Sequence, residues 1–299
     1  MIFLTTPRVT LFLFVSYLSA YSPTVLAQLN IGITLHPYYS YVKNIVGDRA
    51  KVTPLIDAGF NPHAYKLSPA DLDRLNSMDA IVINGIGHDQ FAVDVLERLN
   101  LPNLSIIEAN SQVPLISKAG SGTYNPHTFV SIDAAIRQVY TIAKALAKLD
   151  PENGRYFQKN ALNYAKKLRA IKQQALKKIT ALNLENVRIA STHGAYAYLL
   201  QELGMTVTAV VEPAHGVSPN ASQLQDTITK IRNANVQVLF TELNMANQYV
   251  EVIEKESNTR LFHFSHMTYG EYREELVEQD MSQNLNTLVT ALSYAARRP

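Results

Sequence analysis

The 299 residues are enough for two domains of ordinary size, and the composition, with 47% hydrophobic and 17% charged residues, is that of a globular protein. The formal net charge of only +2 argues against nucleic acid as a partner, because phosphate-binding surfaces bring a clear basic excess. The sequence contains no cysteine, so any metal site must use His, Asp, Glu, main-chain oxygen or water.

Residues 1–27 are predicted to be a secretory signal peptide. Arg8 precedes the apolar stretch 9–20, and Val25-Leu26-Ala27 supplies the small residues that a signal peptidase reads. The apolar stretch is too short to span a bilayer comfortably. We therefore expect a periplasmic protein, and the absence of cysteine predicts that it is not a lipoprotein.

The first half of the mature chain alternates strand-like and helix-like segments. Ser68 and Pro69 have the pattern of a helix start, and Ala80–Asn84 is a continuous apolar run typical of a buried parallel strand. Other predicted strands are Leu29–Leu35, Lys51–Leu55 and Ser105–Glu108. This alternation predicts a doubly wound α/β lobe over residues 28–150.

A long helix is predicted at the centre of the chain. Residues 131–149 form one helix, and Asp150-Pro151 then gives a sharp break in which Asp150 caps the next helix. From Phe157 to Leu182, apolar residues recur every three or four positions, which predicts an amphipathic helix of about 30 residues, roughly 45 Å long. We assign residues 151–183 to a rigid linking helix rather than to a coiled coil.

The second half repeats the α/β rhythm and predicts a C-terminal lobe over residues 184–299. Predicted strands are 187–191, 206–211, 236–241 and 261–264, and predicted helices are 195–203, one opening at Ser218-Pro219, 249–253 and 281–296. The expected fold is therefore α/β, with two doubly wound lobes joined by one long rigid helix.

Three histidines stand in predicted loops, far apart in the sequence. His63 and His127 share the frame Asn-Pro-His, and His193 follows a predicted strand with Gly194 beside it. A local zinc finger would need ligands a few residues apart, whereas this spacing suits a site that the tertiary fold assembles. Imidazole is a common ligand for zinc and related ions, so these histidines predict a metal site.

The chain resembles the zinc/manganese substrate-binding proteins of ABC importers, the ZnuA-like cluster A-I family. The resemblance runs over essentially the whole mature sequence and is carried by the order and spacing of short pieces. These are Asn61-Pro62-His63-Ala64-Tyr65, Ser68-Pro69-Ala70-Asp71, Asn84-Gly85-Ile86-Gly87, Asn125-Pro126-His127, Asp150-Pro151, Thr192-His193 and Ser218-Pro219. The resemblance implies a two-lobed receptor that binds one metal ion between its lobes and hands it to a membrane permease.

The resemblance also implies a set of metal ligands. His63, His127 and His193 correspond to ligands, and three histidines indicate zinc, whereas a carboxylate in third place is typical of manganese proteins. Counting back nine residues from Asn284, as the family pattern suggests, makes Glu275 the candidate fourth ligand; Glu274, Glu271 or a water are alternatives, and an acidic surface turn is an equally good interpretation.

Glu242 and the remaining histidines are assigned supporting or structural roles. Glu242 and His215 are candidates to support a ligand's ring from behind, since metal-bound histidines commonly donate their other ring nitrogen to a carboxylate. His263 and His266 are candidates to line the cleft or to support a ligand, and a structural interpretation is preferred for both. His36 is interpreted as near the site, and His88 as a surface residue.

The sequence therefore predicts a monomeric periplasmic receptor that carries Zn²⁺ to an ABC importer permease. Mn²⁺ is the alternative metal, and a secreted zinc-dependent hydrolase, a metallochaperone or an adhesin is the alternative class of protein. The sequence shows neither His-Glu-x-x-His nor Gly-x-Ser-x-Gly, so we expect that the protein is not an enzyme.

Overall fold

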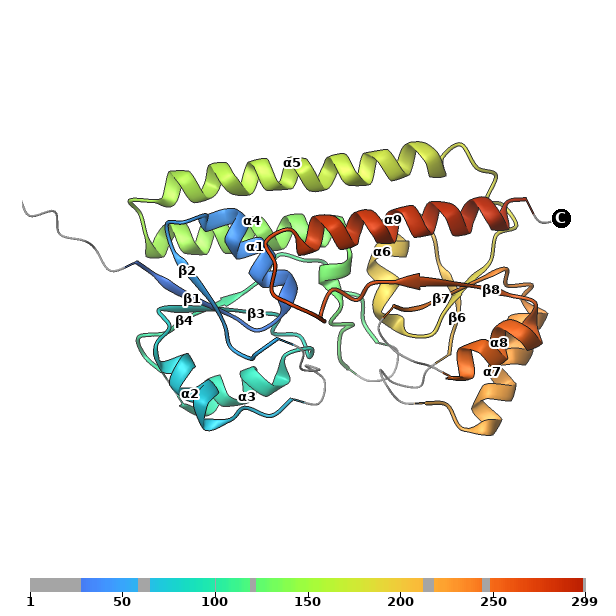
Figure 1. Ribbon diagram of the computed structural model, residues 1–299, viewed down its shortest axis with the longest axis horizontal. Helices are drawn as coiled ribbons and strands as arrows, with labels where there is room; N and C mark the ends of the chain where they lie inside the picture. Colours follow the sequence, from blue (N-terminus) through green and yellow to red (C-terminus); the bar gives the residue numbers. More distant parts are fainter. Residues whose placement is uncertain are drawn as a thin grey trace, which may run out of the picture.

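The computed structural model describes residues 28–58, 65–99, 101–118, 122–211, 218–243 and 248–297. These residues form two lobes side by side, each built on a four-stranded parallel sheet (Figure 1). The N-terminal sheet has the order β2-β1-β3-β4, with β1 Asn30–Ile33, β2 Lys51–Pro54, β3 Ala80–Ile83 and β4 Ser105–Glu108. The C-terminal sheet has the order β6-β5-β7-β8, with β5 Ile189–Ser191, β6 Val207–Val210, β7 Val238–Glu242 and β8 Arg260–Phe264. The predicted fold class, two α/β lobes with a long joining helix, is confirmed.

Helices cover both faces of each sheet. The N-terminal lobe uses α1 His36–Val46, α2 Pro69–Asn76, α3 Gln90–Leu99 and α4 Ile132–Leu149. The C-terminal lobe uses α6 Ala197–Glu202, α7 Ala221–Asn233, α8 Gln248–Ser257 and α9 Leu276–Ala295. Helices α2, α3, α7 and α8 lie on one side of the molecule, and α1, α4 and α9 lie on the other (Figure 1). Within the described part of the chain, no helix has the length and apolarity needed to cross a membrane.

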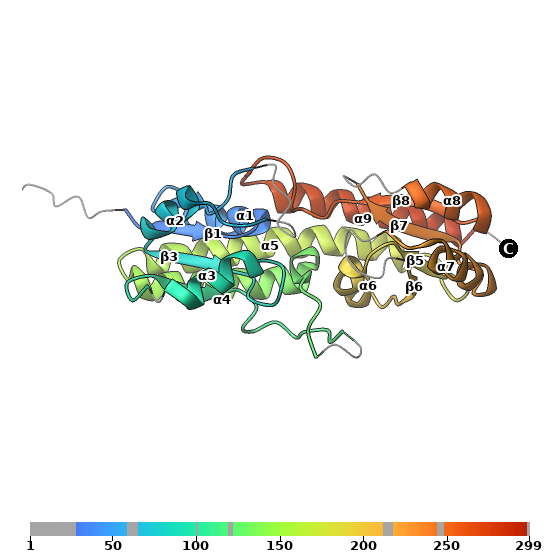
Figure 2. The same ribbon diagram turned by 90° about the horizontal axis from the view of Figure 1, so that it is seen from below.

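Helix α5, Gly154–Ile179, runs along the back of both lobes (Figures 1 and 2). Its buried side chains, among them Phe157, Leu168 and Ile179, belong to one continuous apolar cluster that includes both Ile31 of the first sheet and Phe240 of the second. Each lobe has a second, smaller core on the opposite face of its sheet. The shared cluster ties the two lobes to the same helix, so α5 is part of the hydrophobic core and not merely a tether.

Helix α5 starts three residues later than the sequence pattern predicts, at Gly154 instead of Pro151. Asp150 does not cap it; Asp150 ends α4, and its carboxylate accepts hydrogen bonds from the main-chain nitrogen of Asn153 at 3.1 Å and from the side chain of Asn153 at 2.7 Å. The turn therefore uses residues 151–153, and the helix begins at Gly154. By contrast, Ser68 caps α2 as predicted, in a reciprocal capping box with Asp71.

His36 lies at a contact between the lobes. Its ring stacks on Tyr272 of the C-terminal lobe with centroids 4.1 Å apart, and Nε2 lies 2.9 Å from the carbonyl oxygen of Gly270, to which it donates. The side chain is buried, and burial lowers the pKa of His36 to about 4, although the bond to Gly270 opposes that shift.

This lowered pKa predicts a loss of stability in acid. Because the folded state resists protonation of His36, its contribution is present above the ordinary histidine pKa of 6.5 and is lost as pH falls towards 4. In metal-free protein, we expect His36→Gln to reduce the drop in unfolding free energy between pH 7 and pH 4 by about 3 kcal/mol. Urea titrations at several pH values measure the unfolding free energy of each protein. If this free energy fell equally with pH in the variant and in the unmodified protein, His36 would not be the group responsible.

Candidate metal centre

The candidate site lies where the carboxyl ends of the strands in the two lobes meet. His193 is the second residue after β5, Glu242 is the last residue of β7, and His266 is the second residue after β8. From the N-terminal lobe, His88 lies in the loop between β3 and α3, and His127 immediately precedes a short 3₁₀ helix before α4. Ligands in open α/β sheets are bound at these edges, so the topology brings five chemically active side chains to one place.

Three of these histidines form a compact group. His88, His127 and His266 each offer a ligand atom, and these atoms all lie within 4.8 Å of one another. The ring centroids of His88 and His127 are 5.0 Å apart, and those of His127 and His266 are also 5.0 Å apart. Because a zinc–nitrogen bond measures about 2.0–2.1 Å, nitrogens on one ion are separated by up to about 4 Å, and small ring rotations would bring this group together on a single ion.

His193 borders the same group. Its ring centroid lies 4.7 Å from that of His127 and 6.2 Å from that of His266. The four rings are 1–8% exposed. Neutral imidazole is the form that binds metal, and buried rings can present its nitrogens to an ion with little competing water.

Glu242 adds the carboxylate of the site. It is 2% exposed, and its Oε1 lies 3.8 Å from Nδ1 of His266, which is also 2.8 Å from Oγ1 of Thr268. A carboxylate beside a ligating ring fixes the ring's orientation and raises its basicity. Glu242, which the sequence makes a candidate supporting carboxylate, thus lies beside His266, and its role towards a metal stays a prediction.

The loop around His127 is held by buried amides. Oδ1 of Asn125 accepts hydrogen bonds from the main-chain nitrogen of His127 at 3.1 Å and from its Nδ1 at 2.8 Å. This bond places the ring proton on Nδ1, so the lone pair is on Nε2. Nδ2 of Asn125 donates to the carbonyl oxygen of Gly194 at 2.7 Å, and the hydroxyl of Tyr198 donates to the carbonyl of Asn125 at 2.8 Å. A hydrogen bond therefore connects the turn that contains His127 directly to the turn that contains His193.

The loop that carries His88 is organised by its neighbour Asp89. Its carboxylate accepts from the main-chain nitrogens of Asn84 at 2.6 Å and Gly85 at 3.0 Å, and from the hydroxyl of Thr34 at 2.7 Å. Burial raises the pKa of Asp89, while these three bonds act in the opposite direction. Gly85 adopts a φ of +72°, a conformation that favours glycine, and allows the chain to turn around this carboxylate.

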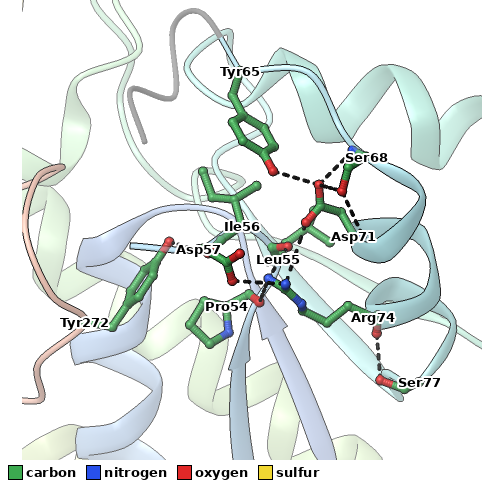
Figure 3. Close-up of polar contacts among 10 residues, drawn as sticks. All are labelled: Pro54, Leu55, Ile56, Asp57, Tyr65, Ser68, Asp71, Arg74, Ser77 and Tyr272. Atoms are coloured by element: carbon green, nitrogen blue, oxygen red, sulfur yellow. Dashed lines mark hydrogen bonds and ion pairs between the residues drawn. The ribbon is translucent and has the colours of Figure 1, made fainter. Parts of the chain in front are cut away.

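His63 and His215 lie outside the described residues. The chain on either side of residues 59–64 is nevertheless fixed to α2 (Figure 3). Arg74 donates to the carbonyl of Leu55 at 2.9 Å and pairs with Asp57 at 3.0 Å, while Asp71 accepts from the hydroxyl of Tyr65 at 2.7 Å. These contacts hold Leu55, Asp57 and Tyr65, which flank the segment that contains His63, against α2.

Among the described residues, Glu275 does not belong to the histidine group. Glu275 is exposed and precedes the first residue of α9, while the carbonyl of neighbouring Glu274 accepts a hydrogen bond from Ser40 on α1. The prediction that His88 is a surface residue is wrong, because His88 is 1% exposed. The sequence signal for His88 and His266 was present: each follows a strand of a parallel sheet, as His193 does.

Comparison with known proteins finds a family model over most of the chain. The model of the zinc-uptake complex component A, periplasmic, matches residues 31–291. The manganese ABC transporter substrate-binding lipoprotein PsaA of Streptococcus pneumoniae is 26% identical over 228 residues, which cover 74% of each chain. The high-affinity zinc uptake system protein ZnuA of Bacillus subtilis is 23% identical over 242 residues, which cover 77% of this chain and 75% of that protein.

Solved structures of the substrate-binding protein FpvC of Pseudomonas aeruginosa are also similar. The FpvC complex with Ni²⁺ is 48% identical in sequence with a TM-score of 0.86, and the match covers 91% of this chain and 99% of FpvC. The FpvC complex with Mn²⁺ is 49% identical with a TM-score of 0.84, over 89% of this chain and 99% of FpvC.

Proposed function

This chain belongs to the family of the periplasmic component A of zinc-uptake complexes, and on that premise we propose that it captures one divalent transition-metal ion between its lobes and delivers it to the permease of an ABC importer. The convergence of His88, His127 and His266 from two lobes carries the proposal. The relatives named as metal ABC transporter proteins support the same role.

We propose that His127, His193 and His266 bind the ion, with His88 as a further nitrogen donor and Glu242 orienting His266. His63 remains a proposed ligand on the strength of its Asn-Pro-His frame. His215 remains a proposed support for a ligand's ring, and Glu275 is the weakest candidate because it is exposed. We propose that the protein acts as a monomer, with residues 28–150 and 184–299 as its lobes, 151–183 as the link and 1–27 as a signal peptide.

The donor set favours zinc over manganese. Neutral imidazole is a borderline ligand, and its affinity for divalent ions rises from manganese towards copper, with zinc well above manganese. The FpvC complexes with Ni²⁺ and Mn²⁺ indicate that related sites accept more than one ion, so the order of preference is the quantity to measure. The burial of all four rings supports ion capture over hydrolysis, because a hydrolase must admit a substrate as well as a metal.

Metal competition tests the proposal. Protein stripped with a chelator and then offered equal Zn²⁺ and Mn²⁺ is expected to retain one zinc per chain, with manganese binding at least about a hundredfold weaker. Elemental analysis after gel filtration gives the stoichiometry. Preferential manganese loading would overturn the choice of zinc and leave the importer role intact, whereas binding of neither ion would remove the basis of the proposal.

A further inference from the structure

The charges of this protein are segregated between the back of the molecule and the remainder. Residues 132–179, which form α4 and α5, contain 11 Lys and Arg against 3 Asp and Glu. The other residues contain 16 Lys and Arg against 22 Asp and Glu. The nearly neutral chain therefore combines a region of net charge +8 with a remainder of −6, and such asymmetry is typical of proteins that meet a charged surface.

The basic residues of α5 form a regular exposed stripe. Helix α5 contains no Asp or Glu, and its exposed Arg155, Lys159, Lys166, Arg169 and Lys177 lie on one side of the helix, opposite the buried side. The stripe extends for about 33 Å at 1.5 Å per residue. With Lys144 on the adjacent helix α4, which is also exposed, these residues are called the basic face.

Large apolar and aromatic side chains are interleaved with the charges. Tyr140, Leu149, Tyr156 and Leu162 are 36–45% exposed. Leu162 lies within the stripe itself. The guanidinium of Arg169 lies over the ring of Tyr140, with its carbon 5.9 Å from the ring centroid. Lysine and arginine mixed with exposed tyrosine and leucine is the composition of surfaces that lie in the headgroup region of a bilayer.

We propose that the basic face binds reversibly to anionic phospholipid headgroups. A straight two-helix surface fits a flat array of phosphates, the basic side chains supply the attraction, and Tyr140 and Leu162 enter the interface. Helix α5 lies on the side of the molecule away from α2, α3, α7 and α8 (Figure 1), so those helices remain in solution. The inference goes beyond metal capture and uses none of the proposed ligands.

Vesicle co-sedimentation of the chain from Gln28 onward tests the proposal; residues 1–27 are omitted because their apolar stretch would itself enter lipid. We expect binding to phosphatidylglycerol-containing vesicles, none to pure phosphatidylcholine vesicles, and release at about 0.5 M salt. Lys159→Gln, Lys166→Gln and Lys177→Gln combined should lower the partition coefficient on the order of a hundredfold, about fivefold per side chain.

The matched control removes three exposed basic residues on the opposite side, by Arg98→Gln, Lys230→Gln and Lys255→Gln on α3, α7 and α8. It has the same net charge as the first variant and should bind vesicles like the unmodified protein. Equal losses in both variants, or no binding to anionic vesicles, would overturn the proposal and leave the basic face as solvated surface or a contact for an acidic protein. Zinc stoichiometry, measured on the same samples, tests the metal site separately.

Discussion

Replacing His266 by alanine is expected to lower the zinc affinity of the protein on the order of a hundredfold or more. The ring is 1% exposed, its ligand atom lies within 4.8 Å of those of His88 and His127, and Glu242 stands beside it. Removing one neutral nitrogen from a buried donor set leaves the ion with a site that water must complete. Competition against a chelator of known zinc affinity measures the loss.

The matched control is Glu275→Gln, which should leave zinc affinity unchanged because Glu275 is exposed, whereas His88, His127 and His266 are buried. Circular dichroism and thermal unfolding of both metal-free variants establish that they are folded. A larger loss in Glu275→Gln than in His266→Ala would show that the family-based assignment of the fourth ligand was right and that the histidine cluster is structural.

The second large effect is expected from Asn84→Ala, which should reduce the free energy of unfolding by about 3 kcal/mol or more. Asn84 is fully buried and directly follows β3. Its Oδ1 accepts from the hydroxyl of Tyr38 at 2.6 Å and from Nδ2 of Asn110 at 2.7 Å, and its Nδ2 donates to the carbonyl of Pro126 at 3.1 Å. Alanine leaves these buried groups without that partner, and each such loss costs about 1–3 kcal/mol.

Because Pro126 precedes His127, Asn84→Ala should also weaken zinc binding about tenfold by loosening the turn that presents the ring. Tyr38→Phe is the control, since it removes one of the same hydrogen bonds without opening a cavity, and should cost only about 1 kcal/mol. Chemical denaturation gives both values. If Asn84→Ala and Tyr38→Phe were equally stable, the side-chain amide of Asn84 would not be what holds the turn before His127 in place.

The order of strands and helices follows from local sequence. The apolar run at β3 has to be buried on both faces, and the apolar periodicity from Phe157 onward has to pack against a core, so each pattern specifies its element. Glycine and capping residues fix where loops turn, as at Gly85 and Ser68. Repetition of these patterns in both halves was enough to predict two α/β lobes around a long helix.

The sequence by itself also predicted that a metal site would use histidine, because no cysteine occurs and because His127 and His193 stand outside the predicted strands and helices. Only the tertiary structure decided which other histidines join them. Whether His88 and His266 are buried together depends on how two sheets, formed by residues far apart in the chain, place their carboxyl edges against each other. That placement is set by packing on α5 and the shared core, which no local pattern encodes.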